Sequence, residues 1–121
     1  MGAAVAPANI DIIEKENLVS QSAAHGDYFH SELQNAVGNK SYVGQIRGQG
    51  MLAAVQLMQE SSTKTFFEPS VKIAPQVTAE CYNNGLIARP LPSVDSVAFS
   101  PPLVTSKSEI DEIVSIFSHS L

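Results

Sequence analysis

The sequence predicts an α+β domain of two layers, in which a sheet of about four mainly antiparallel strands carries helices on one face. Apolar residues recur at helical spacing in three regions of the chain. Between these regions lie two pairs of short apolar runs, each pair joined by a turn that contains glycine or proline. Such short turns connect antiparallel neighbours, because parallel strands need a longer crossover. A length of 121 residues and an apolar content of 44% suit one domain with its own core.

The first helical region, residues 8–38, is predicted to be a helical entry into the domain. Phe29 and Leu33 share one helical face at a spacing of four residues. The small and polar residues before Gly26 predict a kink or a break of the helix near that glycine. Gly38, which is followed by asparagine, predicts the end of the helix because both residue types tolerate a positive φ.

A β-hairpin is predicted next, because apolar runs at residues 42–47 and 51–58 flank the connection Gly48-Gln49-Gly50. The second run is almost wholly apolar, which is typical of a strand covered on both faces. Its leucines, alanines and methionines also favour a helix, so a helix is the alternative there. The flanking glycines and the short length favour the strand. Residues 59–65 are polar and are predicted to form a loop.

A helix is predicted over residues 70–83, and its regular part should begin at Ile73 or Ala74 because Pro75 fits only near a first turn. The dipeptide Asn84-Gly85 is expected to close this helix.

Two short apolar strands follow within residues 85–92 and 96–104, joined by a turn that contains proline. Arg89 is expected at the end of the first of these strands. The last helix begins at a Ser106-x-x-Glu109 capping box. One face of this helix is apolar, and it is formed by Ile110, Ile113, Val114, Phe117 and Leu121.

The bulk properties of the chain exclude several classes of protein. The net charge of −5 argues against nucleic acid or an anionic membrane as a partner. No apolar run approaches the length of a membrane-spanning helix, and the first residues lack the basic start of a signal peptide. Cys81, as the single cysteine, excludes an internal disulfide and is expected to be a buried apolar residue. These features predict a cytoplasmic protein.

The chain offers few candidates for chemistry, and no metal site or catalytic residue is predicted in it. His25, His30 and His119 are scattered, and the first two are splayed on a helix, so solvent-facing histidines are expected. The Gly48-x-Gly50 pair lacks the spacing of a phosphate-binding loop. Arg47 is expected to form a partly exposed ion pair. For Arg89, the residues alone leave an ion pair and a carboxylate-binding role equally open.

The chain resembles the end of class III (omega-type) pyridoxal-phosphate-dependent aminotransferases. Four segments match this family in order, and together they cover nearly the whole chain: Ala8–Leu18, Val43–Met51 with Arg-Gly-Gln-Gly, Gly85–Arg89 with Gly-Leu-x-x-Arg, and Ala98–Val104 with Pro-Pro-Leu. The resemblance implies that residues 1–121 are a single C-terminal small domain of a fold-type I enzyme. This domain would comprise the helical entry 8–38 and a sheet-and-helix part 42–121, and the large cofactor-binding domain would be absent.

The resemblance also implies a function. The intact enzyme would move an amino group from an omega-amino acid or amine to a keto acid such as pyruvate. Arg89 would bind the substrate carboxylate, and the partners would be the missing large domain and the second subunit of a homodimer. Pyridoxal 5'-phosphate is expected in the intact enzyme but not in this chain, which should be inactive alone. The family's cofactor residues are matched by none of the five lysines: Lys15, Lys40, Lys64, Lys72 and Lys107.

Two other functions are kept as alternatives. One is a stand-alone module that binds small carboxylates, and the other is an interaction domain without a ligand. For the aminotransferase interpretation, we also expect the isolated chain to self-associate through an exposed apolar face.

Overall fold

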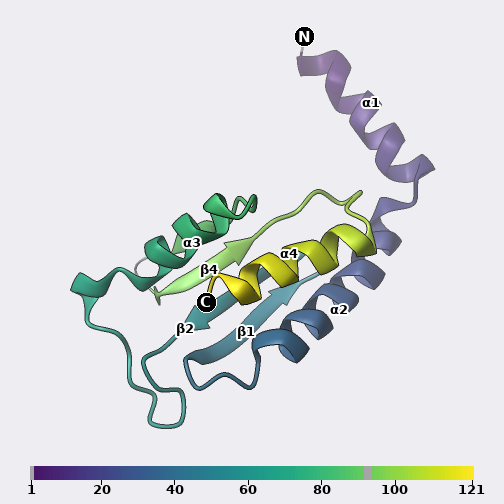
Figure 1. The fold of residues 1–121 in the computed structure, drawn as a ribbon. Helices are drawn as coiled ribbons and strands as arrows, with labels where there is room; N and C mark the ends of the chain where they lie inside the picture. The colour runs from purple at the N-terminus through teal and green to yellow at the C-terminus, as the bar shows by residue number, and fades with distance from the viewer. Residues whose placement is uncertain (1, 92–93) are drawn as a thin grey trace.

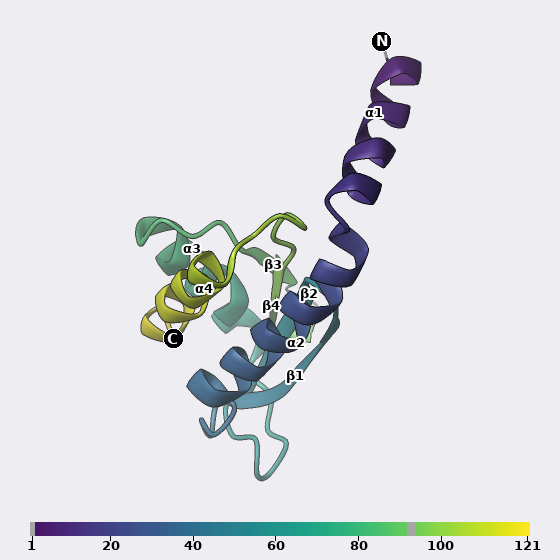
Figure 2. The same ribbon diagram turned by 90° about the vertical axis from the view of Figure 1, so that its right-hand side faces the viewer.

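The computed structural model describes residues 2–91 and 94–121, and it confirms the predicted α+β architecture. The sheet has four strands in the order β1-β2-β4-β3, and every neighbouring pair is antiparallel (Figure 1; β3 is labelled in Figure 2). Helices α2, α3 and α4 contribute to one core on one face of this sheet, whereas α1 projects away from it (Figure 2). The elements are α1 (Gly2–Lys15), α2 (Leu18–Val37), β1 (Val43–Gln49), β2 (Leu52–Leu57), a 3-10 turn (Pro69–Val71), α3 (Ile73–Asn83), β3 (Arg89–Leu91), β4 (Ser96–Phe99) and α4 (Lys107–His119).

The helical entry is divided at a different residue from the one predicted. The break between α1 and α2 lies at Asn17, whose φ of 53° is left-handed, and α2 continues through Gly26 without interruption. Gly26 is buried because its lack of a side chain lets α2 pack against Gly50. The predicted end of α2 is confirmed, but Gly38 has a φ of −63° and does not use the positive φ that glycine allows.

The predicted hairpin is confirmed as β1 and β2, but its connection is shorter than expected. Gly48 belongs to β1, and the turn consists of Gly50 and Met51 only. The prediction that the second strand is covered on both faces is wrong. Residues of β2 alternate between buried and more exposed positions, and Leu52 is 61% exposed. One face of the sheet therefore packs on the helices and the other is open.

The second half of the chain begins as predicted, with α3 starting at Ile73 and closing at Gly85, whose φ is 93°. Arg89, however, is the first residue of β3 rather than the end of a strand. Pro90 is tolerated because β3 lies at the edge of the sheet, where a missing backbone N–H leaves no ladder bond unmade. The predicted turn between the two strands includes Pro92, which lies outside the described residues.

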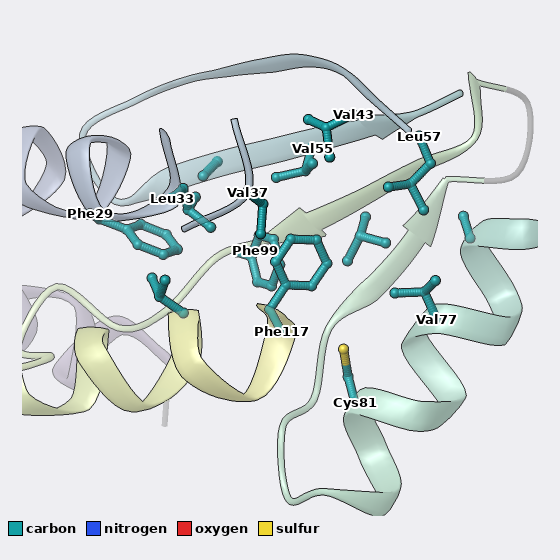
Figure 3. Packing of buried hydrophobic residues seen from close by; sticks show 14 of the residues in the cluster. Phe29, Leu33, Val37, Val43, Val55, Leu57, Val77, Cys81, Phe99 and Phe117 are labelled. Carbon is teal, nitrogen blue, oxygen red and sulfur yellow. The ribbon is translucent and has the colours of Figure 1, made fainter. Parts of the chain in front are cut away.

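Aromatic side chains link the helices to the sheet in the core. Phe99 of β4 contacts Phe29 of α2 edge-on at a centroid distance of 6.0 Å and Phe117 of α4 at 5.0 Å (Figure 3). Edge-to-face pairs of this kind add roughly 0.5–1.5 kcal/mol each beyond their buried area. Phe99 therefore joins α2 and α4 to one of the central strands of the sheet.

The predicted start of α4 is also confirmed. The Ser106 side chain accepts a hydrogen bond from the backbone N–H of Glu109, and the Glu109 carboxylate accepts one from the backbone N–H of Ser106. Within residues 2–91 and 94–121, no helix has the length and hydropathy needed to cross a membrane.

Candidate functional site

The two arginines of the chain lie in one row across the sheet. Arg47 of β1 pairs with Ala54 of β2, Ala54 pairs with Ala98 of β4, and Ala98 pairs with Arg89 of β3. Directly paired residues of antiparallel strands project from the same face. Since Val55, the neighbour of Ala54, points into the core, this row projects from the open face.

A pocket of about 480 Å³ lies above this row, and both arginines line it. Its floor includes Ala54 and Ala98, whose methyl groups leave the space between the arginines free of longer side chains. Leu52 and Leu91 add apolar surface. The pocket therefore combines two cationic walls with an apolar floor.

Arg89 also lines a second pocket of about 590 Å³. This pocket extends toward the Pro101-Pro102 corner and to Ile113 on α4. The Arg89 side chain is exposed, and it lies where both pockets can be reached. A long and exposed side chain on an edge strand can change direction without moving the backbone.

Arg47 is half-buried, and among the described residues its side chain contacts a hydroxyl group rather than the carboxylate of the predicted ion pair. Its Nη2 donates a hydrogen bond to Ser96 Oγ at 3.2 Å. Ser96 is buried, and its hydroxyl donates to the Val94 carbonyl oxygen at 3.0 Å. A neutral hydroxyl group therefore orients the guanidinium without neutralising its charge.

Sequence reasoning missed the part that Arg47 and Ser96 play in this pocket. The two residues are far apart along the chain and meet only because β1, β2 and β4 pair in this register. The sequence offered one usable signal, which is that the chain has only two arginines and each stands in a predicted strand.

The prediction that the histidines face solvent is wrong for His25 and His30. It is confirmed for His119, which is exposed. His25 is half-buried, and its Nδ1 lies 2.9 Å from the carbonyl oxygen of Thr105. His30 is also half-buried, and its buried Nε2 has no hydrogen-bond partner among the described residues. Both lie on α2, which packs against the core, and this packing explains their burial. In the part of the chain that the structure describes, no cluster of side chains could hold a metal ion.

Cys81 lies in the core, as predicted, and none of its surface is exposed. Burial raises the pKa of its thiol. A buried thiol with a raised pKa is a poor nucleophile, so the residue has a structural role.

These observations define an α+β domain with a candidate anion-binding pocket on its open face. Comparison with known proteins then identifies its family. The family model of the class-III aminotransferases matches residues 1–121. Diaminobutyrate–2-oxoglutarate transaminase from Halomonas elongata is 39% identical over 94% of this chain and 24% of its own length. The chain belongs to the class-III aminotransferase family.

Solved structures agree with this assignment. A transaminase obtained by ancestral reconstruction and directed evolution has a TM-score of 0.94 and 43% identity over 98% of this chain and 26% of its own. An (S)-enantioselective omega-transaminase from Thermomicrobium roseum has a TM-score of 0.90 and 32% identity over 97% of this chain and 25% of its own. The chain thus spans about a quarter of the length of the proteins it matches.

The family is dependent on pyridoxal phosphate, which binds an enzyme lysine through a Schiff base. Neither arginine-lined pocket is lined by a lysine. All five lysines are exposed and none of them lines these pockets; the Nζ atom of Lys107 lies 4.9 Å from the centroid of the Tyr28 ring. The described residues therefore do not fit a site for this cofactor, and the chemistry that it supplies cannot be derived from them.

Proposed function

We propose that the protein to which this chain belongs is a pyridoxal-phosphate-dependent transaminase. It would move an amino group from an omega-amino acid or amine to a keto acid such as pyruvate. Family membership and the transaminases among its relatives support this proposal. The chain would be the C-terminal small domain, whereas a large domain and the second subunit of a homodimer would supply the cofactor site.

In this proposal, the role of the chain is to bind the substrate carboxylate through Arg89. The observation that carries the proposal is the position of Arg89, which is exposed between the pocket on the open face of the sheet and the pocket that extends to Ile113 of α4. Its guanidinium is charged at all relevant pH values and can bind a carboxylate through two parallel hydrogen bonds. Because the side chain is free to turn, it can also move aside for a substrate without a carboxylate.

The apolar floor of the pocket would hold the carbon skeleton of the substrate. Ala98 lies beside Arg89 in both pockets. Its apolar surface lowers the local dielectric constant and thereby strengthens the charge-assisted hydrogen bonds to the carboxylate. Arg89 would in this way orient the substrate, and residues outside this chain would perform the amino transfer.

The test is Arg89→Gln in the intact enzyme, with a keto acid and an uncharged aldehyde as alternative amino acceptors. Hydrogen bonds to a charged group contribute about 1.5–3 kcal/mol, so kcat/KM for the keto acid should fall roughly 10- to 100-fold. The value for the aldehyde should stay the same, because no carboxylate is lost. Unchanged kinetics with the keto acid would contradict the role of Arg89 and favour an interaction domain.

The isolated chain is expected to have no transaminase activity when pyridoxal phosphate is added. Turnover by this chain alone would contradict the assignment of the cofactor site to other residues.

A further inference from the structure

Arg47 is a second cationic side chain in the pocket that also contains Arg89. The two residues are separated by three strand-to-strand steps, through Ala54 and Ala98. At a strand spacing of 4.7–4.9 Å, their Cα atoms are about 14 Å apart. Both side chains are long and can lean toward each other over the two alanines. The row therefore leaves room for one small molecule between two guanidinium groups.

The charge of Arg47 is available to a ligand. The hydrogen bond that it donates goes to the neutral Ser96 hydroxyl, and it occupies one of the five N–H groups of the guanidinium. The proton of Ser96 is directed to the Val94 carbonyl, so the lone pairs of the hydroxyl oxygen face Arg47. The guanidinium is held in place, while its remaining donors are free for an anion.

The partial burial of Arg47 adds a reason to expect an anion. A cation that is partly removed from water without a carboxylate partner is unfavourable, and a bound anion offsets this cost. Arg89, by contrast, is exposed on the edge strand β3, where its side chain can change direction. The pocket thus has one oriented cation and one adjustable cation.

We propose that Arg47 is the second carboxylate ligand of this pocket, so that the arginine pair selects short dicarboxylates over monocarboxylates of the same length. One carboxylate would be bound by Arg89 and the other by Arg47, with the carbon chain lying over Ala54 and Ala98. This inference rests on the proposed function for its substrate class. Among keto-acid acceptors, the arginine pair would favour those with a second carboxylate over a monocarboxylate such as pyruvate.

The test is calorimetric binding of glutarate and pentanoate to the intact protein. The two acids have the same number of carbon atoms and differ by one carboxylate. Neither can accept an amino group, so binding is measured without catalysis. The wild-type protein should bind glutarate about tenfold more tightly than pentanoate, which corresponds to one additional charge-assisted hydrogen-bonded pair.

Arg47→Gln should remove this preference by weakening glutarate roughly tenfold while leaving pentanoate unchanged. Arg89→Gln should weaken both ligands. Gln45→Ala is the matched control, because Gln45 is exposed on the same strand and the same face but does not line the pocket. Glutarate binding by Arg47→Gln that equals the wild-type value would overturn the proposal.

A second variant covers the case in which Arg47→Gln does not fold. Arg47→Lys keeps the positive charge but loses the planar fork, so glutarate should weaken severalfold and pentanoate should not change. Equal weakening of both acids would contradict the proposal. Because binding is measured without turnover, loss of the glutarate preference in these variants would support the arginine pair even if the enzyme proved not to be a transaminase.

Discussion

Gly26 of α2 lies against the backbone of Gly50 in the β1–β2 turn. A Cβ atom built on Gly26 would be 2.4 Å from the carbonyl carbon of Gly50, which is far inside contact distance. The absence of a side chain allows the helix to approach the hairpin turn backbone to backbone. This contact fixes α2 relative to the hairpin that carries Arg47.

Gly26→Ala is therefore expected to destabilise the protein. In an unobstructed helix the same change would stabilise it by about 0.5–1 kcal/mol, because alanine favours the helix. Here the added methyl group forces the turn away from α2, and overpacking of this kind costs about 1–3 kcal/mol. Urea unfolding measures the difference. Ser31→Ala, at an exposed position of α2, is the control and should not lower stability; a stabilising effect of Gly26→Ala would show that the close contact is unimportant.

Ser106→Ala is expected to lower the free energy of unfolding by about 1 kcal/mol. The Ser106 hydroxyl caps the backbone N–H of Glu109, and this N–H would lose its partner in the variant. Thermal unfolding would measure the loss. Ser115→Ala is the matched control, because Ser115 is exposed within the same helix and does not cap it. An equal effect of both substitutions would argue that the cap contributes nothing specific.

The capping box should also make stability dependent on pH. Hydrogen bonds from the backbone N–H and then from the hydroxyl group of Ser106 lower the pKa of Glu109 below its usual 4.5. A carboxyl group with a lowered pKa in the folded state stabilises the fold above its unfolded pKa, and this contribution is lost as the pH falls through the folded pKa. The stability difference between wild type and Glu109→Gln should thus be largest at neutral pH and shrink below about pH 4.5.

Unfolding midpoints of the two proteins, measured from neutral pH down to about pH 3, provide this comparison. The pKa of Glu60 is also lowered by hydrogen bonds from Ser62. Both proteins contain Glu60, so its contribution cancels in the difference between their stabilities. A difference that stays constant over the whole range would contradict the prediction.

Tyr28 is expected to ionise at unusually high pH. Its hydroxyl donates a hydrogen bond to Asp111 at 2.7 Å, and this bond, joined by burial and the negative charge of Asp111, raises the pKa of Tyr28 from 10.0 to about 12. The protonated tyrosine stabilises the contact between α2 and α4 below pH 10, and this contribution is lost as the pH rises through about 12. The absorbance of ionised tyrosine, followed as the pH is raised, should therefore show a titration step of Tyr28 near pH 12.

The titrating group is assigned by two variants. Tyr28→Phe should remove the late titration, and Asp111→Asn should return it toward 10.0, the usual value. A late titration that survives Tyr28→Phe would belong to another tyrosine and would contradict the assignment.

Features that depend on near neighbours in the chain could be predicted from the sequence. The capping box, the glycine that closes α3, the hairpin and the order of the elements all follow from residues a few positions apart. The single cysteine was also correctly assigned to the core. Arg89 could be selected as a candidate from its residue type and from the family resemblance, but its part in binding stays a prediction.

The residues that meet across the sheet could not be predicted in this way, because their contacts arise from the packing of distant segments. The break at Asn17, the burial of His25 and His30, and the start of β3 at Arg89 depend on packing between distant segments. The row from Arg47 to Arg89 depends on three strand pairings, and a shift of one residue in any of them would place the two side chains on opposite faces. Strand register arises from contacts between residues far apart in the chain, and for this reason no local pattern could place the two arginines in one pocket.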